Sequence, residues 1–390
     1  MKKTLLTICL TWMCFSLSAQ KIIDLSGKWS FSIDRQDNGE KEKWFSHTLN
    51  DCINLPGSMP EKLKGDEVTA KTQWTGSLYD SSYYYNPYME KYRKEGNIKF
   101  PFFLTPDKHY VGAAWYQKEV NIPADWKGER ILLFLERPHI ETTVWVNGQK
   151  TGMQNSLCVP HQYDITRYVR PGKCTITIRV DNRIKEINVG PDSHSITDQT
   201  QGNWNGIVGR ICLQTTPKTY FDDIQIYPEP EQKLARVKVV IKGAGITKIK
   251  LSAESFNTDK KHIVPAIQQE IKLNKGVTET EMVLPMGNDM LLWDEFHPAL
   301  YKLKAEVTNG KKTEIKEIQF GMRRFEIKGK WFYVNGRKTQ LRGTVENCDF
   351  PLTGYAPMDV ESWERVFRIC RSYGLNHMRC LLYTSPSPRD

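Results

Sequence analysis

Apolar and polar residues alternate in short runs over most of the first 217 residues, and this pattern predicts β-strands rather than helices. In LSGKWSFSID, the side chains of Trp29, Phe31 and Ile33 fall on one face, and lysine and serines fall on the other. Further alternating runs lie at 113–123 and 175–183, and 131–138 reads as a fully apolar strand closed by Pro138. Asn147-Gly148 follows a β-branched run and predicts a hairpin turn. Many short strands at this spacing predict a sandwich or jelly roll over residues 20–217.

A long insertion interrupts these strands at residues 75–106. It is rich in tyrosine and phenylalanine and contains Pro87 and Pro101. The segment is too irregular for a regular element and too aromatic for a disordered linker. Loops of this length in compact domains are usually functional or flexible.

Residues 218–321 predict a second β unit. The stretch ARVKVVIKG alternates strictly, and YKLKAEVTNGKK does the same before ending in an Asn-Gly turn. About one hundred residues of such strands are typical of an immunoglobulin-like sandwich. The Cys–Trp–Cys spacing of antibody domains is absent from the sequence, so the pattern predicts the architecture alone.

The pattern changes after residue 321. A hairpin with its turn at Asn335-Gly336 is followed by a buried strand, a helix and a second buried strand. Asp359 is expected to cap the helix and Gly374 to end it. The apolar residues at helical spacing are Val360, Trp363, Val366, Phe367, Ile369 and Cys370. A strand–helix–strand unit of this kind predicts the opening of a parallel α/β domain.

The amino terminus has the pattern of a secretory signal peptide over residues 1–19. Lys2 and Lys3 precede an apolar run, and Ser18-Ala19 places a cleavage site before Gln20. We therefore expect export to the periplasm or the cell exterior. No later stretch is apolar enough to predict a transmembrane helix.

The distribution of charge argues against nucleic-acid binding, and the spacing of the cysteines argues against a zinc site. The formal net charge is +10, but the basic residues are scattered rather than clustered, which disfavours nucleic-acid binding. Of nine cysteines, two fall in the predicted signal, and the rest show no CxxC motif, so zinc-site spacing is absent from the sequence. Export permits disulfides, and at most one or two pairs are expected, without an assignment.

Three motifs in sequence order resemble glycoside hydrolase family 2, the group of β-galactosidases, β-glucuronidases and β-mannosidases. They are GNWNGIVGRICL at 202–213, LWDEFHPALYKL at 292–303 and FGMRRFEIKGKWFYVNGRKTQLRGT at 320–344. Glu295 departs from the proline usual in the second motif. The resemblance implies a mainly β fold, with a jelly-roll sugar-binding domain (20–217) and an immunoglobulin-like β-sandwich (218–321). Residues 322–380 would then form the first βαβ unit of an incomplete TIM (β/α)8 barrel, because a closed barrel needs roughly 250 residues.

The resemblance also implies the chemistry. Family members hydrolyse β-glycosides with retention, using two glutamates about 5 Å apart. It places both on later barrel strands, beyond residue 390, so no catalytic residue is assigned here, and Glu346 comes too early in the barrel to be one. Supporting active-site roles are implied for Arg342, which is expected to follow the first strand of the βαβ unit, and for Asn347 and Arg379. Arg379 would hold a nucleophilic carboxylate ionised. For Arg379 a structural ion pair is the alternative.

Sugar contacts are implied for residues of the first domain. The candidates are Asn86, Gln201, Asn203, Trp204 and Asn205. For each of them, a turn-capping or loop role is the alternative. The expected partner is a carbohydrate substrate. No organic cofactor is implied, and although some relatives bind Mg²⁺ or Na⁺, no carboxylate cluster in the sequence indicates such a site.

The last ten residues, 381–390, read LLYTSPSPRD and break the helix–strand pattern. They resemble translated sequencing-adapter text, and we expect them to be non-native. Two hypotheses for function follow. The chain is either the amino-terminal part of an exported exo-acting β-glycosidase, inactive by itself, or a non-catalytic carbohydrate-binding or adhesion module of two β-sandwiches. The sequence leaves the sugar, the linkage and the oligomeric state open.

Overall fold

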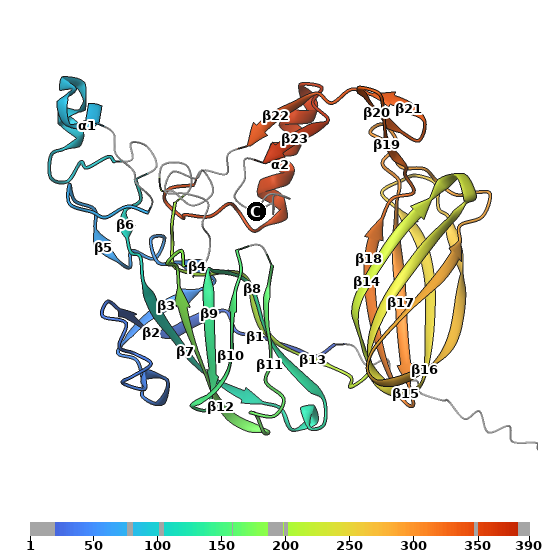
Figure 1. The fold of residues 1–390 in the computed structure, drawn as a ribbon, viewed down its shortest axis with the longest axis horizontal. Helices are drawn as coiled ribbons and strands as arrows, with labels where there is room; N and C mark the ends of the chain where they lie inside the picture. The colour runs from blue at the N-terminus through green and yellow to red at the C-terminus, as the bar shows by residue number, and fades with distance from the viewer. Residues whose placement is uncertain are drawn as a thin grey trace, which may run out of the picture. The chain divides into compact units, whose positions relative to one another are not determined.

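The computed structural model describes residues 20–75, 81–100, 105–157, 159–185, 198, 202–346 and 350–380. The predicted signal segment 1–19, the tail 381–390, Gln201 and Asn347 lie outside the described residues. The chain divides into two compact units (Figure 1). One comprises residues 217–326 and 333–337, and the other comprises residues 21–216 together with 327–332 and the segment from 338 onward.

Two antiparallel sheets form most of the unit that contains residues 21–216 (Figure 1). The first sheet has the order β1-β13-β8-β11, with β4 paired to β13: Ile22–Asp24, Gly206–Thr216, Arg130–His139, His161–Asp164 and Gly57–Ser58. The second has the order β10-β9-β12-β7-β2-β3: Gln149–Asn155, Glu141–Val146, Gly172–Asp181, Ala113–Ile122, Gly27–Asp34 and Asp51–Leu55. Their apolar side chains form one continuous core.

The predicted alternation and hairpin are confirmed in this unit. Trp29 and Phe31 are buried in the core, and Ile33 packs against it half-buried. Asn147 and Gly148 have φ angles of 50° and 77°, and they connect the antiparallel strands β9 and β10. Both residues thus adopt the left-handed conformation that a two-residue hairpin of the I′ type requires.

The insertion contains short regular elements, contrary to the prediction that it is wholly irregular. It lies between β5 (Asp66–Glu67) and β6 (Lys108–His109), which pair with each other. Helix α1 spans Ser81–Tyr85, and the 3-10 helix η2 spans Pro87–Tyr92. Among the described residues, further 3-10 turns are η1 (Trp44–Ser46), η4 (Ala124–Trp126) and η5 (Pro230–Gln232).

The other unit is a five-stranded antiparallel sheet with its own core. Its strands are β14 (Tyr220–Glu229), β15 (Leu234–Phe256), β16 (Ile263–Pro285), β17 (Leu300–Asn309) and β18 (Lys312–Phe320). The first half of β15 pairs with β14 and the second half with β17. The pairing of β15 with β16 shifts register between Gly243 and Gly245. Such a bulge lets one long strand bend and serve two neighbours.

The segment after residue 324 contains the predicted hairpin and the predicted strand–helix–strand unit. Strands β19 (Phe325–Lys328), β20 (Trp331–Val334) and β21 (Arg337–Thr339) form a small sheet. Strand β22 (Gly343–Glu346), helix α2 (Val360–Ser372) and strand β23 (His377–Cys380) follow, and the two strands pair in parallel. The Asp359 side chain accepts a hydrogen bond from the Ser362 amide, and Gly374 ends the helix with φ 75°, as predicted.

Two further observations concern the cysteines and the membrane-spanning potential of the helices. Within the described part of the chain, the free thiols are Cys52, Cys174, Cys212 and Cys370. The described helices include none of the length and apolarity that crossing a bilayer would require.

Candidate functional site

The predicted sugar contacts Asn203, Trp204 and Asn205 directly precede strand β13, and all three are buried. The Asn205 amide nitrogen donates to the backbone oxygens of Gly112 and Val180, each at 3.0 Å. Its side-chain oxygen accepts from the Tyr116 hydroxyl at 2.7 Å. These bonds occupy the carboxamide of Asn205 and hold β13 to the ends of β7 and β12, which is the loop role named as the alternative.

Asn203 belongs to a polar cluster centred on Asp198. The Asp198 carboxylate accepts from the backbone N–H of Thr75 at 2.5 Å and from that of Asn203 at 2.8 Å. The Asn203 amide nitrogen donates to the Thr75 hydroxyl at 2.9 Å, and its oxygen accepts from Asn182 at 3.0 Å. His109 lies beside the cluster, with its Nε2 3.6 Å from Asp198 Oδ2. The sequence analysis missed Asp198 and His109, although Asp198 opens the polar run that contains Gln201.

Trp204 is the centre of an aromatic stack. The His139 ring lies 4.5 Å from it, centroid to centroid, at 22°, and His139 Nδ1 donates to the Trp204 carbonyl at 2.7 Å. Burial lowers the pKa of His139 to about 3, so this imidazole is neutral at physiological pH. The Tyr355 ring lies 5.5 Å from Trp204 on the segment that follows β22. The stack therefore joins the sandwich to the loop before α2.

Two further contacts fix that loop. The Tyr355 hydroxyl donates to Glu61 at 2.8 Å, and the Ser58 hydroxyl donates to the backbone oxygen of Thr353. Gly354 has φ 81°, and a Cβ there would come within 2.8 Å of Trp204. Only glycine permits this close approach of the backbone to the indole ring.

Two buried polar atoms among the described residues have no hydrogen-bond partner: Trp204 Nε1 and His109 Nε2. Leaving a buried donor unpaired costs about 1–3 kcal/mol, so such atoms usually have a partner. One is on the stack and the other beside Asp198, and Trp204 and Asp198 are linked through Asn203. The indole N–H can donate to a hydroxyl or carboxylate oxygen, and the imidazole nitrogen can bond either a donor or an acceptor, depending on its tautomer.

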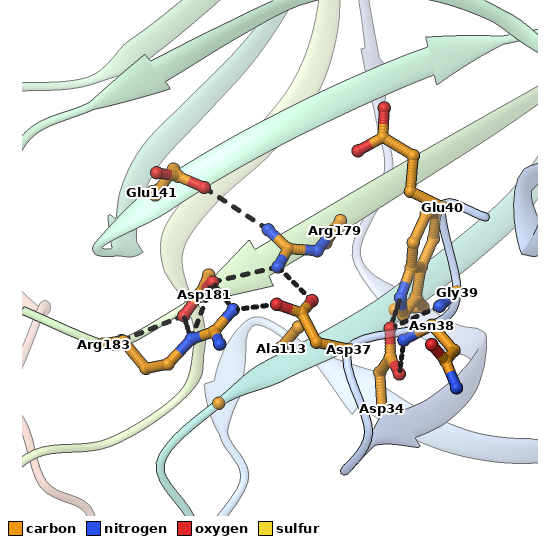
Figure 2. A network of polar contacts seen from close by, with 12 residues as sticks. Asp34, Asp37, Asn38, Gly39, Glu40, Ala113, Glu141, Arg179, Asp181 and Arg183 are labelled. Atoms are coloured by element: carbon orange, nitrogen blue, oxygen red, sulfur yellow. Dashed lines mark hydrogen bonds and ion pairs between the residues drawn. The ribbon is translucent and has the colours of Figure 1, made fainter. Parts of the chain in front are cut away.

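An ion-pair network supports this cluster from strand β12 (Figure 2). It consists of three cations and three carboxylates: Arg179, Arg183, Lys185, Asp37, Glu141 and Asp181. Burial acts to raise the pKa of Asp181, but hydrogen bonds from Arg183 and Lys185 outweigh it and hold the pKa well below its usual range. Asn182, which bonds Asn203, directly follows Asp181. The network thus fixes the backbone that carries the polar cluster.

The position of Arg342 corrects the sequence analysis. We expected it to follow the first strand of the βαβ unit, but β22 begins at Gly343, so Arg342 lies at the amino end. Its guanidinium donates to the backbone oxygen of Gly374 at 2.8 Å, and its backbone amide donates to Asn376 at 2.8 Å. The strand thus forms after Arg342 rather than before it, and Arg342 braces the turn between α2 and β23.

Arg379 lies near the carboxyl end of β23, beside Val345 of β22. Its side chain is exposed, and it has no ion-pair partner among the residues that the structure describes. Glu346 ends β22 and pairs with Cys380. The parallel strands therefore bring Arg379 and Glu346 to the same edge, whereas Asn347 lies outside the described residues.

Asn86 has a local contact. Its side-chain oxygen accepts from the Tyr88 amide at 2.9 Å and caps the 3-10 helix η2. This is the turn-capping role named as the alternative for this residue. As for metals, no group of three or more His, Cys, Asp or Glu side chains within the described ranges could hold an ion.

Comparison with known proteins identifies family models that match most of the chain. The model described as "Glycosyl hydrolases family 2, sugar binding domain" matches residues 22–217, and the model "Glycosyl hydrolases family 2" matches residues 219–323. A β-galactosidase of Oenococcus oeni is 23% identical over 382 residues, which cover 93% of this chain and 34% of that protein. Human β-glucuronidase is 23% identical over 398 residues, which cover 92% and 53%.

A solved structure shows the same fold. The β-glucuronidase from Ruminococcus gnavus in complex with D-glucuronic acid matches with a TM-score of 0.66 and 19% sequence identity. The match covers 93% of this chain and 56% of that one. The chain thus spans between about a third and about half of the length of these relatives.

Proposed function

We propose, since the chain belongs to family 2 of the glycosyl hydrolases, that it is the amino-terminal part of an exported, retaining, exo-acting β-glycosidase. Such an enzyme removes terminal β-linked sugars from oligo- or polysaccharides. The observation that carries the proposal is the order of parts. Two family models match in succession over residues 22–323, and a parallel β22–α2–β23 unit follows them. In this proposal the three parts are, in order, a jelly roll, an immunoglobulin-like sandwich and the start of a TIM barrel.

The chemistry of such an enzyme needs two carboxyl groups about 5 Å apart, one as nucleophile and one as acid and base. We assign both to protein outside these 390 residues, because the matched relatives are about two to three times as long. In this proposal Arg379 supplies a fixed positive charge at the carboxyl edge of the parallel strands. A cation there lowers the pKa of a neighbouring carboxyl and keeps it ionised for nucleophilic attack.

The first domain would contribute a sugar contact through Trp204 rather than through its neighbouring asparagines. The side-chain bonds of Asn203 and Asn205 are made within the protein. The Trp204 indole N–H is buried and unpaired, so a hydroxyl or carboxylate of a substrate would satisfy it. Gln201 and Asn347 stay proposed contacts on the resemblance alone.

The assay that tests the proposal compares the whole chain with the full reading frame that contains it. Aryl β-galactosides and β-glucuronides come first, because relatives with those names match over most of the chain. We expect hydrolysis with retention by the full-length product and none by the 390 residues alone. Turnover by the chain alone would refute the assignment of the carboxylates. A genomic frame that stops near codon 380 would favour the binding-module alternative.

A Trp204 variant tests the sugar contact in the full-length enzyme. Trp204→Phe keeps an aromatic ring on His139 but removes the N–H, so KM should rise several-fold with the fold unchanged. Trp126→Phe is the matched control, since Trp126 is also buried in the first domain, at 3% exposure, but its indole is not among the buried atoms without a partner. Export is tested by mass spectrometry of the secreted protein, which should begin at Gln20.

A further inference from the structure

The aromatic insertion is organised around a small core of its own. Tyr83 is 1% exposed, its ring lies 4.6 Å from that of Phe100, and its hydroxyl donates to the Tyr92 carbonyl at 2.7 Å. The Arg93 guanidinium donates to the carbonyl of Tyr83 and, at 3.4 Å, to that of Asn86. These contacts join α1 to η2, so the segment has a defined tertiary structure and is not an extended loop.

Two tyrosines on this element point away from its core. Tyr85 is 77% exposed and Tyr88 is 85% exposed. They flank Asn86 and Pro87, and the Asn86 side chain caps η2 through the Tyr88 amide, which fixes the backbone between the two rings. Large aromatic side chains that are exposed on a structured segment often mark interaction sites.

The segment that carries the two rings has an excess of positive charge. Segment 81–100 has four cations and two carboxylates: Lys91, Arg93, Lys94, Lys99, Glu90 and Glu95. Lys91 Nζ lies over the Tyr92 ring at 4.8 Å, and Lys94 pairs with Glu90 at 3.3 Å on the surface. Flat aromatic faces suit the apolar C–H faces of pyranose rings, and the excess of cations suits carboxylates on those rings.

We propose that Tyr85 and Tyr88 form a secondary binding surface for an acidic polysaccharide chain, distinct from the Trp204 contact. The inference rests on the proposed function only in taking a saccharide as the ligand class. The tyrosine rings bind sugar faces, and the excess of positive charge on the same segment favours chains that bear uronic acids. A surface of this kind would retain a polymeric substrate between successive cleavages of its ends.

Affinity electrophoresis of the whole chain tests the surface. Gels containing polygalacturonate should retard the wild-type chain, and gels containing neutral galactan should not. Tyr85→Ala/Tyr88→Ala should weaken binding about tenfold, as expected for loss of two aromatic contacts. Tyr85→Phe/Tyr88→Phe should keep most of it. Tyr227→Ala is the matched control, because Tyr227 is 50% exposed on β14 of the other unit and should leave retardation unchanged.

Several results would overturn the surface. Unchanged retardation of the double alanine variant would remove the tyrosines from the site, and equal retardation by galactan would remove the selection for acidic chains. Absence of wild-type retardation by polygalacturonate would overturn the proposal entirely, as would concentration-dependent dimers lost in the double variant. Failure of the proposed enzymatic function would appear separately, as lack of aryl-glycoside hydrolysis by the full-length product, and would leave the gel result unaffected.

Discussion

The amino-terminal sandwich and the β22–α2–β23 segment have equally clear apolar patterns but opposite degrees of burial. In the sandwich, Trp29 is 1% exposed and Tyr116 is fully buried. In α2 no described residue is buried, and Val360 and Phe367 are 75% and 52% exposed. A periodic pattern thus identifies the side chains that share a face, whereas burial depends on a partner element.

This difference in burial indicates that the sandwich, and not α2, provides most of the stability of the described chain. Burying a large apolar side chain contributes about 1.5–3 kcal/mol, and the sandwich buries dozens. Helix α2 has 13 residues, and helices of about 12–15 residues are marginal without tertiary packing. We therefore expect core substitutions in the sandwich to act globally and substitutions in α2 to act locally.

The largest effect is expected from Trp29→Ala. The ring is buried in the core, and its Nε1 donates to the Leu25 carbonyl at 2.8 Å. Truncating a buried aromatic of this size lowers the free energy of unfolding by about 3–5 kcal/mol. Urea denaturation followed by circular dichroism measures it. Trp331→Ala, at a site that is 41% exposed, is the control. Equal losses for both variants would contradict the comparison.

The next effect is expected from Asp181→Asn in the network of Figure 2. Asp181 is fully buried and accepts from Arg179 at 3.0 Å, so the variant leaves the network with one positive charge in excess. Breaking one partner of a buried pair costs about 3 kcal/mol. The matched control is Asp125→Asn, an exposed aspartate paired with Lys21, which should leave the unfolding midpoint unchanged. A neutral outcome for Asp181→Asn would show that the network is solvated.

The same residue sets a pH dependence. The pKa of Asp181 in the folded chain lies well below its value in the unfolded chain, which is about 3.9. Its contribution to stability is therefore fully present above about pH 4 and is lost as the pH falls through the folded value. The difference in unfolding free energy between wild type and Asp181→Asn should be constant from pH 7 to about pH 5 and should shrink in stronger acid.

Features set by near neighbours in the sequence were predictable, and features assembled by the fold were not. Asn147-Gly148 and the Asp359 cap depend on local backbone conformation, and both are as predicted. Asp198 escaped notice because its partner Thr75 lies 123 positions away and meets it only in the folded chain. Asparagine is a residue type suited to sugar contact, but the side-chain amide of Asn205 is hydrogen-bonded to the backbone beside β7 and of β12.

A smaller, local effect is expected from Asp359→Ala at the start of α2. The Asp359 carboxylate accepts from the Ser362 amide at 2.8 Å, and losing such a cap destabilises the first turn of the helix. Hydrogen exchange of the first amides of α2 should accelerate about fivefold, while amides of β12 keep their protection. Asp359→Ser retains a capping oxygen and should restore the slow rate. Equal acceleration in Asp359→Ser would exclude capping as the cause.

The smallest effect on stability is expected from Phe367→Ser. Phe367 stacks on Trp363 at 5.9 Å in a groove on the outside of α2, and no other described element buries it. Surface substitutions of this kind usually change the free energy of unfolding by about 0.5 kcal/mol or less. The variant should instead reduce self-association in sedimentation velocity, since exposed apolar faces promote aggregation. Arg365→Ser on the same helix is the control for placing serine in the helix, because it leaves the apolar face unchanged. A loss of stability as large as that of Trp29→Ala would mean that α2 is packed in solution, and the contrast between the two regions would then fail.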